Sequence, residues 1–165
     1  MRICPRCQLK YPDDNDRCFV DGANLEAMPD ERIGTTLGGR YLLESAIGEG
    51  GMATVYRARH TLVDRPVAIK VMASHLTKDA SLRERFRREA KNSASLAHPN
   101  IIEILDTGET DDGTAFMVME LLDGASLGRV IETQGAMPSA KVAELGLQIA
   151  RGLARAHDFQ VVHRD

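Results

Sequence analysis

The chain has 165 residues, of which 43% are hydrophobic and 27% are charged, and its formal net charge at pH 7 is −3. This amount of apolar material suffices for one modest core plus an appendage. The absence of a basic excess argues against a nucleic-acid partner. The first residues lack the apolar run of a signal peptide, and the longest apolar stretch, Ala115 to Leu122, is too short to cross a bilayer. We therefore expect a cytoplasmic protein without a membrane segment in this chain.

All three cysteines lie close to the amino terminus. Cys4 and Cys7 form one pair with a two-residue gap, and after ten intervening residues Cys18 and Asp21 repeat that gap. Two such knuckles can place four ligands around a tetrahedral metal ion, and zinc accepts a carboxylate oxygen as well as thiolates. The pattern therefore predicts a zinc site formed by Cys4, Cys7, Cys18 and Asp21, although the complete pattern would have a fourth cysteine.

Other interpretations of this segment stay open. Water can take the place of Asp21, or the metal can be lost. A disulfide would leave one thiol over and would need an oxidising compartment, for which the sequence carries no signal. Asp21-Gly22 is also a good turn without any metal. We favour zinc because so short a segment cannot bury a core without a cross-link. Residues 1–26 are thus expected to be zinc-ribbon-like, and residues 27–39 to be a linker.

A glycine-rich turn follows the first of three predicted strands, which cover residues 41–47, 53–60 and 65–72. Gly48, Gly50 and Gly51 remove side chains where a backbone can lie close to phosphate oxygens, and Val55 returns the chain to a strand. A Walker loop or a dinucleotide fingerprint would open a helix instead. Such a turn can be an ordinary hairpin, but here it suggests a flap over a nucleotide.

The third strand carries a lysine on an unusual face. In Val67-Ala68-Ile69-Lys70-Val71 the two-residue period places Ala68 and Lys70 opposite the three β-branched residues. A small residue beside a lysine suggests a flat surface for an adenine ring that ends in a charge for phosphate. A solvated lysine on an edge strand would give the same pattern.

The helix predicted over about residues 80–96 supplies a partner for this lysine. Its start has the form of a capping box at Ser81–Glu84, and Glu89 falls on its apolar side. An inward carboxylate costs several kcal/mol, on the order of a buried unpaired ion, unless a cation meets it. We expect Lys70 to be that cation; a half-exposed Glu89 paired with a neighbouring arginine is the alternative.

The remaining elements complete an α+β arrangement. Two further strands, near residues 102–107 and 115–121, are joined by an Asp-Asp-Gly turn and give a five-stranded antiparallel sheet with one helix against it. Ser126 is expected to cap a short helix that ends at Gly135, and a longer helix follows Pro138.

Six phrases in order connect these elements to a known family: G-E-G-G-M-A-T-V-Y, V-A-I-K, R-R-E-A, H-P-N-I-I, M-V-M-E and V-V-H-R-D. From about Arg40 to Asp165 the chain resembles the eukaryotic-like Ser/Thr protein kinases of bacterial signalling. The resemblance implies a complete small lobe over about 40–121 and the start of a large lobe over 122–165. The cysteine-containing segment at the amino terminus also resembles the small zinc ribbons found ahead of the kinase domain in some of these proteins.

The resemblance implies roles for particular residues. Lys70 would contact the α- and β-phosphates of ATP and be held by Glu89, and Asp165 would accept the proton of the substrate hydroxyl. The nucleotide would lie against the flap, the strand faces and the connection between the lobes, which comprise Ile47, Gly48, Gly50, Gly51, Val55, Ala68, Met119, Glu120 and Leu122. The partners implied are ATP and proteins that bear Ser or Thr.

Two motifs of the family are absent from these 165 residues. The asparagine after the His-Arg-Asp phrase and the Asp-Phe-Gly sequence, which hold Mg²⁺ against the nucleotide, do not occur. We therefore expect the polypeptide as given to be a fragment with little or no phosphotransfer of its own. The alternative function is a non-catalytic module in which a zinc ribbon and a nucleotide-binding lobe bind a partner.

Overall fold

The structure, a computed structural model, describes residues 2–12, 14–77 and 79–162. The chain divides into two compact units, residues 1–33 and residues 34–165. No helix within the described ranges is long and apolar enough to cross a membrane.

The first unit is a small antiparallel sheet with a core rich in cysteine. Strand β1 (Arg2–Ile3) lies between β2 (Lys10–Tyr11) and β3 (Glu26–Ala27). The buried residues are Cys4, Tyr11, Cys18 and Leu25. Because two of these four are cysteines, this unit has little apolar material of its own to stabilise it.

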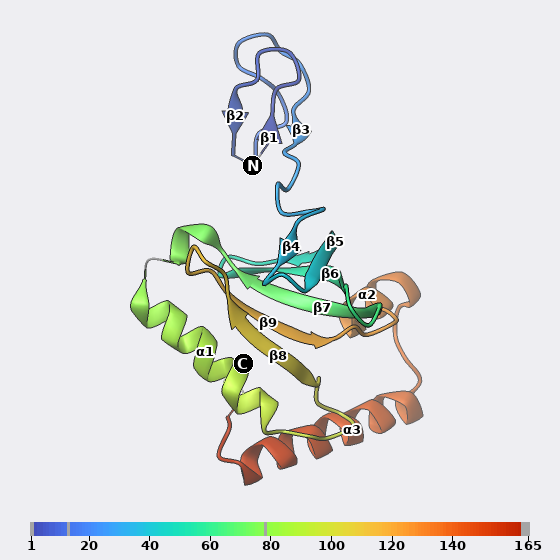
Figure 1. Cartoon of the computed structure of the whole chain (residues 1–165). Coiled ribbons are helices and arrows are strands. Elements are labelled where there is room, and N and C mark those ends of the chain that lie inside the picture. The colour runs from blue at the N-terminus through green and yellow to red at the C-terminus, as the bar shows by residue number, and fades with distance from the viewer. Residues whose placement is uncertain (1, 13, 78, 163–165) are drawn as a thin grey trace. The chain divides into compact units, whose positions relative to one another are not determined.

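The second unit is built on a six-stranded antiparallel sheet in the order β4-β5-β6-β7-β9-β8 (Figure 1). Its strands are β4 (Thr36–Leu37), β5 (Tyr41–Glu49), β6 (Ala53–His60), β7 (Arg65–Met72), β8 (Ile104–Glu109) and β9 (Ala115–Glu120). The expected five strands are present within a few residues of their predicted bounds. Strand β4 is an addition within the expected linker: Leu37 is buried in the core, and Gly38 and Gly39 adopt positive φ to turn the chain back into β5.

The two faces of the sheet bury different residues. One face encloses Leu37, Tyr41, Leu43, Tyr56, Ala58, Val67, Ile69, Val71, Phe116 and Val118. The other face packs against α1 through Ala53, Met72, Phe86, Ala90, Ala115 and Met117. Residues 67, 69 and 71 of β7 belong to the first face, as their two-residue period predicted. Ala68 and Lys70 therefore lie on the face that α1 covers.

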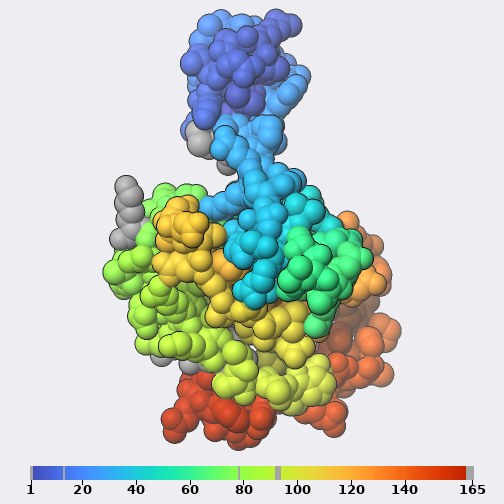
Figure 2. Space-filling view, viewed as in Figure 1, coloured from blue at the N-terminus to red at the C-terminus, as the bar shows by residue number. Residues whose placement is uncertain are grey.

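Helix α1 (Ala80–Ala94) begins earlier than a capping box at Ser81 would allow. The Asp79 carboxylate accepts hydrogen bonds from the backbone N–H groups of Ser81 and Leu82, at 2.9 and 3.1 Å. Asp79 is therefore the capping residue, and the predicted capping box is wrong. Phe86 and Ala90 are buried against the sheet, and Figure 2 shows the yellow-green atoms of α1 lying against the yellow atoms of β8.

Two more helices follow the last strand of the sheet, and a short 3-10 turn at Ser74–Leu76 lies before α1. Helix α2 (Leu127–Gln134) is capped by the Ser126 hydroxyl, which accepts from the N–H of Arg129, and it ends at Gly135 with φ 76° as predicted. Helix α3 (Ser139–Asp158) buries only Gly152. A Cβ atom on Gly152 would lie 2.9 Å from the carbonyl oxygen of Asn100, so this glycine lets the loop before β8 contact the helix.

We predict that Gly108→Ala destabilises the second unit. Gly108 lies opposite Phe116 in the β8–β9 ladder, and a Cβ atom there would lie 2.3 Å from the tip of the Phe116 ring. Because the buried ring must move, we expect a loss of about 1–3 kcal/mol in the free energy of unfolding, measured by urea denaturation. Gly146→Ala in α3 is the control, since its Cβ meets nothing within 4 Å. It should be neutral or stabilise by up to about 1 kcal/mol. Equal effects of the two changes would contradict the prediction.

Candidate functional site

Lys70 lies two residues before the end of β7, and its side chain points toward α1. Its Nζ donates to Oε1 of Glu89 at 2.6 Å and lies 5.8 Å from the centre of the Phe86 ring. The structure thus brings together the strand lysine and the helix glutamate that the sequence paired. Phe86 was not predicted as a neighbour of the charge; its spacing, one turn before Glu89, was the available signal.

The Lys70–Glu89 pair is more exposed than expected. The side chains are 29% and 55% exposed, respectively, so Glu89 is not the inward, buried carboxylate that the apolar stripe predicted. In the chain Glu89 stands between Phe86 and Ala90, which are buried against the sheet, but one residue changes the direction around the helix axis by about 100°. Glu89 therefore lies at the edge of the packed face of α1. The ion pair therefore orients the Lys70 side chain toward α1, and it contributes only modestly to the stability of the unit.

The register of the sheet aligns the residues expected around a nucleotide. Val55, Lys70 and Met117 form one row across β6, β7 and β9, and Arg57, Ala68 and Met119 form the next. Residues directly opposite one another point to the same face. Val55, Ala68 and Met119 therefore share a face with Lys70, and Ala68 and Met119 are buried there. This gives a small, apolar surface that ends at an ammonium group.

The glycine flap, residues 47–52, connects β5 to β6 and carries Ile47, Gly48, Gly50 and Gly51. Gly48 pairs with Val55, and the N–H of Gly50 donates to the carbonyl of Ala53 at 3.0 Å. The N–H of Ala73, after β7, donates to the carbonyl of Met52 at 3.0 Å. Ile47 remains 52% exposed. The flap is thus a hairpin between strands, as predicted, and is fastened at its base.

The chain leaves the sheet at Glu120, where the predicted connection begins. The N–H of Glu120 donates to the carbonyl of Glu103, and its Oε1 accepts from the N–H of Glu103 at 2.8 Å. The backbone N–H of Glu120 is therefore not a donor for a ligand, whereas Leu122 is two residues beyond the strand with a side chain that is 66% exposed. Asp165, the predicted catalytic carboxylate, lies outside the described residues.

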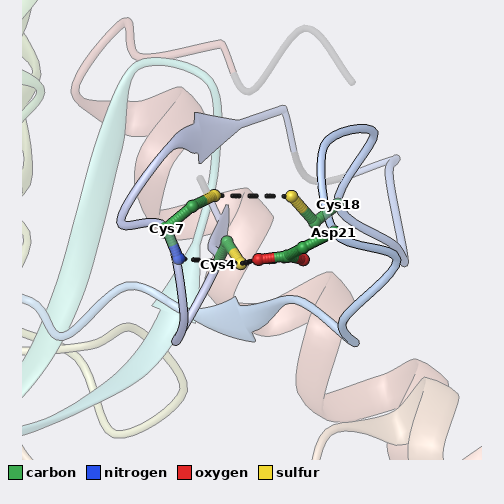
Figure 3. A group of neighbouring side chains, drawn as sticks. All are labelled: Cys4, Cys7, Cys18 and Asp21. Atoms are coloured by element: carbon green, nitrogen blue, oxygen red, sulfur yellow. Dashed lines mark hydrogen bonds between the residues drawn. The ribbon is translucent and has the colours of Figure 1, made fainter.

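In the first unit, the ligand atoms of Cys4, Cys7, Cys18 and Asp21 lie within 4.8 Å of one another (Figure 3). The Sγ atoms of Cys7 and Cys18 are 3.5 Å apart, and Sγ of Cys4 lies 3.3 Å from Oδ2 of Asp21. Ligands of a tetrahedral zinc with bonds of about 2.0–2.3 Å are separated by distances of this order.

The two knuckles have the same backbone pattern. In the first, the Cys4 carbonyl accepts from the N–H of Gln8, and the Cys4 N–H donates to the carbonyl of Leu9; in the second, Cys18 makes the same two bonds to Gly22 and Ala23. Gln8 and Gly22 both have positive φ, at 61° and 70°. Asp21 therefore occupies in the second knuckle the position that Cys7 occupies in the first.

Hydrogen bonds around the sulfur atoms set their protonation. The N–H of Leu9 favours a thiolate at Cys7, but burial and hydrogen bonds to Cys18 and Cys4 raise the pKa of Cys7 to about 11. Burial also opposes ionisation of Cys18, yet bonds from the Tyr11 hydroxyl and from backbone N–H groups lower its pKa. Tyr11 was not predicted as part of this cluster.

Comparison with known proteins places this chain in a family. The family model for the protein kinase domain matches residues 41–165. The chain belongs to the protein kinase domain family.

Two relatives of this kinase domain are bacterial proteins. A serine/threonine-protein kinase of Streptomyces coelicolor, PksC, is 44% identical over 135 residues, which are 78% of this chain and 24% of the relative. PrkC of Bacillus subtilis, also a serine/threonine-protein kinase, is 42% identical over 133 residues, covering 81% of this chain and 20% of PrkC. The chain therefore spans only about a quarter or less of the length of these relatives.

Solved structures confirm the fold. The crystal structure of the PknI kinase domain of Mycobacterium tuberculosis matches with a TM-score of 0.67 and 30% identity, over 80% of this chain and 53% of that one. The predicted small lobe, an antiparallel sheet with one helix against it followed by the first helices of the large lobe, is confirmed.

We predict that Glu89→Gln has little effect on the stability of the apo protein. Because the carboxylate is 55% exposed, the loss in free energy of unfolding should be no more than about 1 kcal/mol. Phe86→Ala in the same helix should cost about 3–5 kcal/mol, because its ring is 5% exposed in the core. Urea denaturation of both variants tests this; a loss at Glu89 as large as that at Phe86 would restore the buried-charge interpretation.

Proposed function

We propose that this chain is the nucleotide-binding part of a protein kinase that transfers the γ-phosphoryl group of ATP to Ser or Thr of proteins. The observation that carries the proposal is the ion pair at 2.6 Å between Lys70 and Glu89, on the same sheet face as Val55, Ala68 and Met119. An apolar surface that ends in an oriented ammonium group is suited to an adenine ring joined to phosphates.

Each residue of the site has a separate task in this proposal. The ring lies between Ile47, Val55, Ala68 and Met119, and its edge pairs with the Glu120 carbonyl and the Leu122 N–H. Gly48, Gly50 and Gly51 bring backbone N–H groups over the phosphates, and Lys70, held by Glu89, neutralises α- and β-phosphate charge. Asp165 accepts the proton of the attacking hydroxyl.

The family uses ATP and Mg²⁺. Among the described residues, the one group of three or more potential metal ligands is the cluster in the first unit, so those residues assemble no Mg²⁺ site beside Lys70. We therefore assign no Mg²⁺ ligand. The use of ATP as donor favours the cytoplasm as the location.

Lys70→Met tests the function. Binding of Mg-ATP to the 165-residue polypeptide, followed by calorimetry, should weaken or vanish in this variant. In the product of the natural gene, phosphorylation of a generic protein substrate should fall on the order of 10²-fold or more, because the charge that stabilises the transferring phosphates is lost.

Lys141→Met is the matched control, since Lys141 is 53% exposed on α3 and paired with Glu144. It should leave both measurements unchanged. ATP binding without any Lys70-dependent phosphotransfer by the natural gene product would favour the non-catalytic nucleotide-binding module.

For the first unit, we propose a structural zinc site ligated by Cys4, Cys7, Cys18 and Asp21, so that the unit is a zinc ribbon ahead of the kinase domain. The matching backbone of the two knuckles supports Asp21 as the counterpart of Cys7. When bound, zinc would cross-link two knuckles whose apolar core is small.

Asp21→Asn tests the ligand set. Protein purified without chelator should contain stoichiometric zinc by elemental analysis, and the variant should lose zinc at a lower chelator concentration. Because binding must displace the proton of Cys7, whose pKa is about 11 in the metal-free protein, apparent affinity should fall as the pH falls. Asp16→Asn, an exposed acid outside the cluster, should match the wild type. Metal content near zero with three titratable thiols would eliminate the site.

A further inference from the structure

Strand β5 carries two irregularities just before the glycine flap. In its ladder with β6, the register shifts between Leu43 and Ser45 and again between Ala46 and Gly48. Glu44 and Ile47 are therefore the extra residues of two bulges that lie close together. Bulges bend a strand and increase its twist. These two bulges therefore affect the direction in which β5 enters the glycine flap.

The first bulge is held by charges. One oxygen of Glu44 accepts from Nε of Arg59 at 2.8 Å, and the other accepts from Nε of Arg57 at 3.2 Å. Arg59 also donates to Asp64 at 3.0 Å, in the turn between β6 and β7. Glu44 is only 27% exposed, and the bond from Arg59 lowers its pKa. We call Glu44, Arg57 and Arg59 the Glu44 clamp. In Figure 2 the cyan atoms of β5 and the green atoms of that turn lie side by side on the surface.

The clamp lies on the face that the nucleotide would use. Arg57 pairs with Ser45 on one side and with Ala68 on the other, and Ala68 pairs with Met119. Arg57 thus lies beside Ala68 in the same row of residues across the sheet as the proposed adenine surface, and it is the member of that row next to β5. Its charge is neutralised by Glu44, so the row presents no free cation to the ring.

A bulge changes the register of an antiparallel ladder by one residue, so loss or movement of the bulge shifts the pairing that follows it. Such a move turns each following side chain to the opposite face. Gly48, which lies opposite Val55, follows Glu44 closely, so a shift at Glu44 would turn Gly48 away from the face of Val55 and displace the flap. A carboxylate bound by two guanidinium groups of the partner strand opposes this movement.

We propose that Glu44 is a positioning residue, which through Arg57 and Arg59 fixes the bulge of β5 and thereby the place of the glycine flap over the nucleotide. The nucleotide part of this inference rests on the proposed function, whereas the ordering of the flap does not.

Glu44→Gln tests the clamp, because it keeps the size of the side chain but turns an NH₂ group toward one of the arginines. Hydrogen exchange of the amides of residues 48–52 in the apo protein should accelerate about fivefold or more, while amides of the core strand β7 stay unchanged. The dissociation constant of ATP should rise about three- to tenfold, since an unfixed flap must be ordered on binding.

Graded variants and a control separate positioning from general stability. Arg59→Gln, which removes the shorter bond and the link to Asp64, should have a larger effect than Arg57→Gln. Glu144→Gln makes the same chemical change in an exposed pair on α3 and should change neither flap exchange nor ATP affinity. If the wild type fails to bind ATP, the proposed function fails, and flap exchange alone decides the clamp. Unchanged exchange at residues 48–52 in Glu44→Gln overturns the inference, whatever the ATP affinity.

Discussion

The alternation of side chains along β7 is the constraint on which the second unit depends. Val67, Ile69 and Val71 are almost completely buried on one face, and no other placement of this strand would remove them from water. Ala68 and Lys70 must then face α1, and the lysine must find an anion there. Glu89 supplies it from a helix that is itself fixed by Phe86 and Ala90. The hydrophobic core therefore determines where the ammonium group lies, and the ion pair follows from it.

The features recovered from the sequence are those encoded by short-range periodicity. Strand bounds, the glycine flap and the Lys70–Glu89 pair follow from spacings of two and from helical spacing. Strand β4 has only two residues and forms because Leu37 reaches the core, which no local pattern reports. Asp79 and Ser81 are both good capping residues, so sequence could not choose between these nearby positions. The exposure of Glu89 depends on which side of α1 the sheet covers, since Phe86 and Ala90 on either side of it in the chain are buried.

The same distinction applies to the first unit. The four candidate ligands were found because each pair lies within one turn of backbone, where spacing and geometry are nearly equivalent. The hydrogen bond between Tyr11 and Cys18 joins a strand to the second knuckle, and nothing in the spacing of the cysteines indicates it. The two bulges of β5 were likewise invisible, because a bulge is a property of a pair of strands, and the sequence shows one strand at a time.

Helix α3 buries a single residue against the rest of its unit. Its single buried residue, Gly152, rests on the carbonyl of Asn100, and the Asn100 side chain donates to Gln148 one turn earlier. Besides Gly152, only a few residues of α3, among them Leu145 and Ala156, are half-buried. Most of the apolar side chains of the helix, Val142, Leu147 and Ile149 among them, are therefore left with more than half of their surface exposed to solvent.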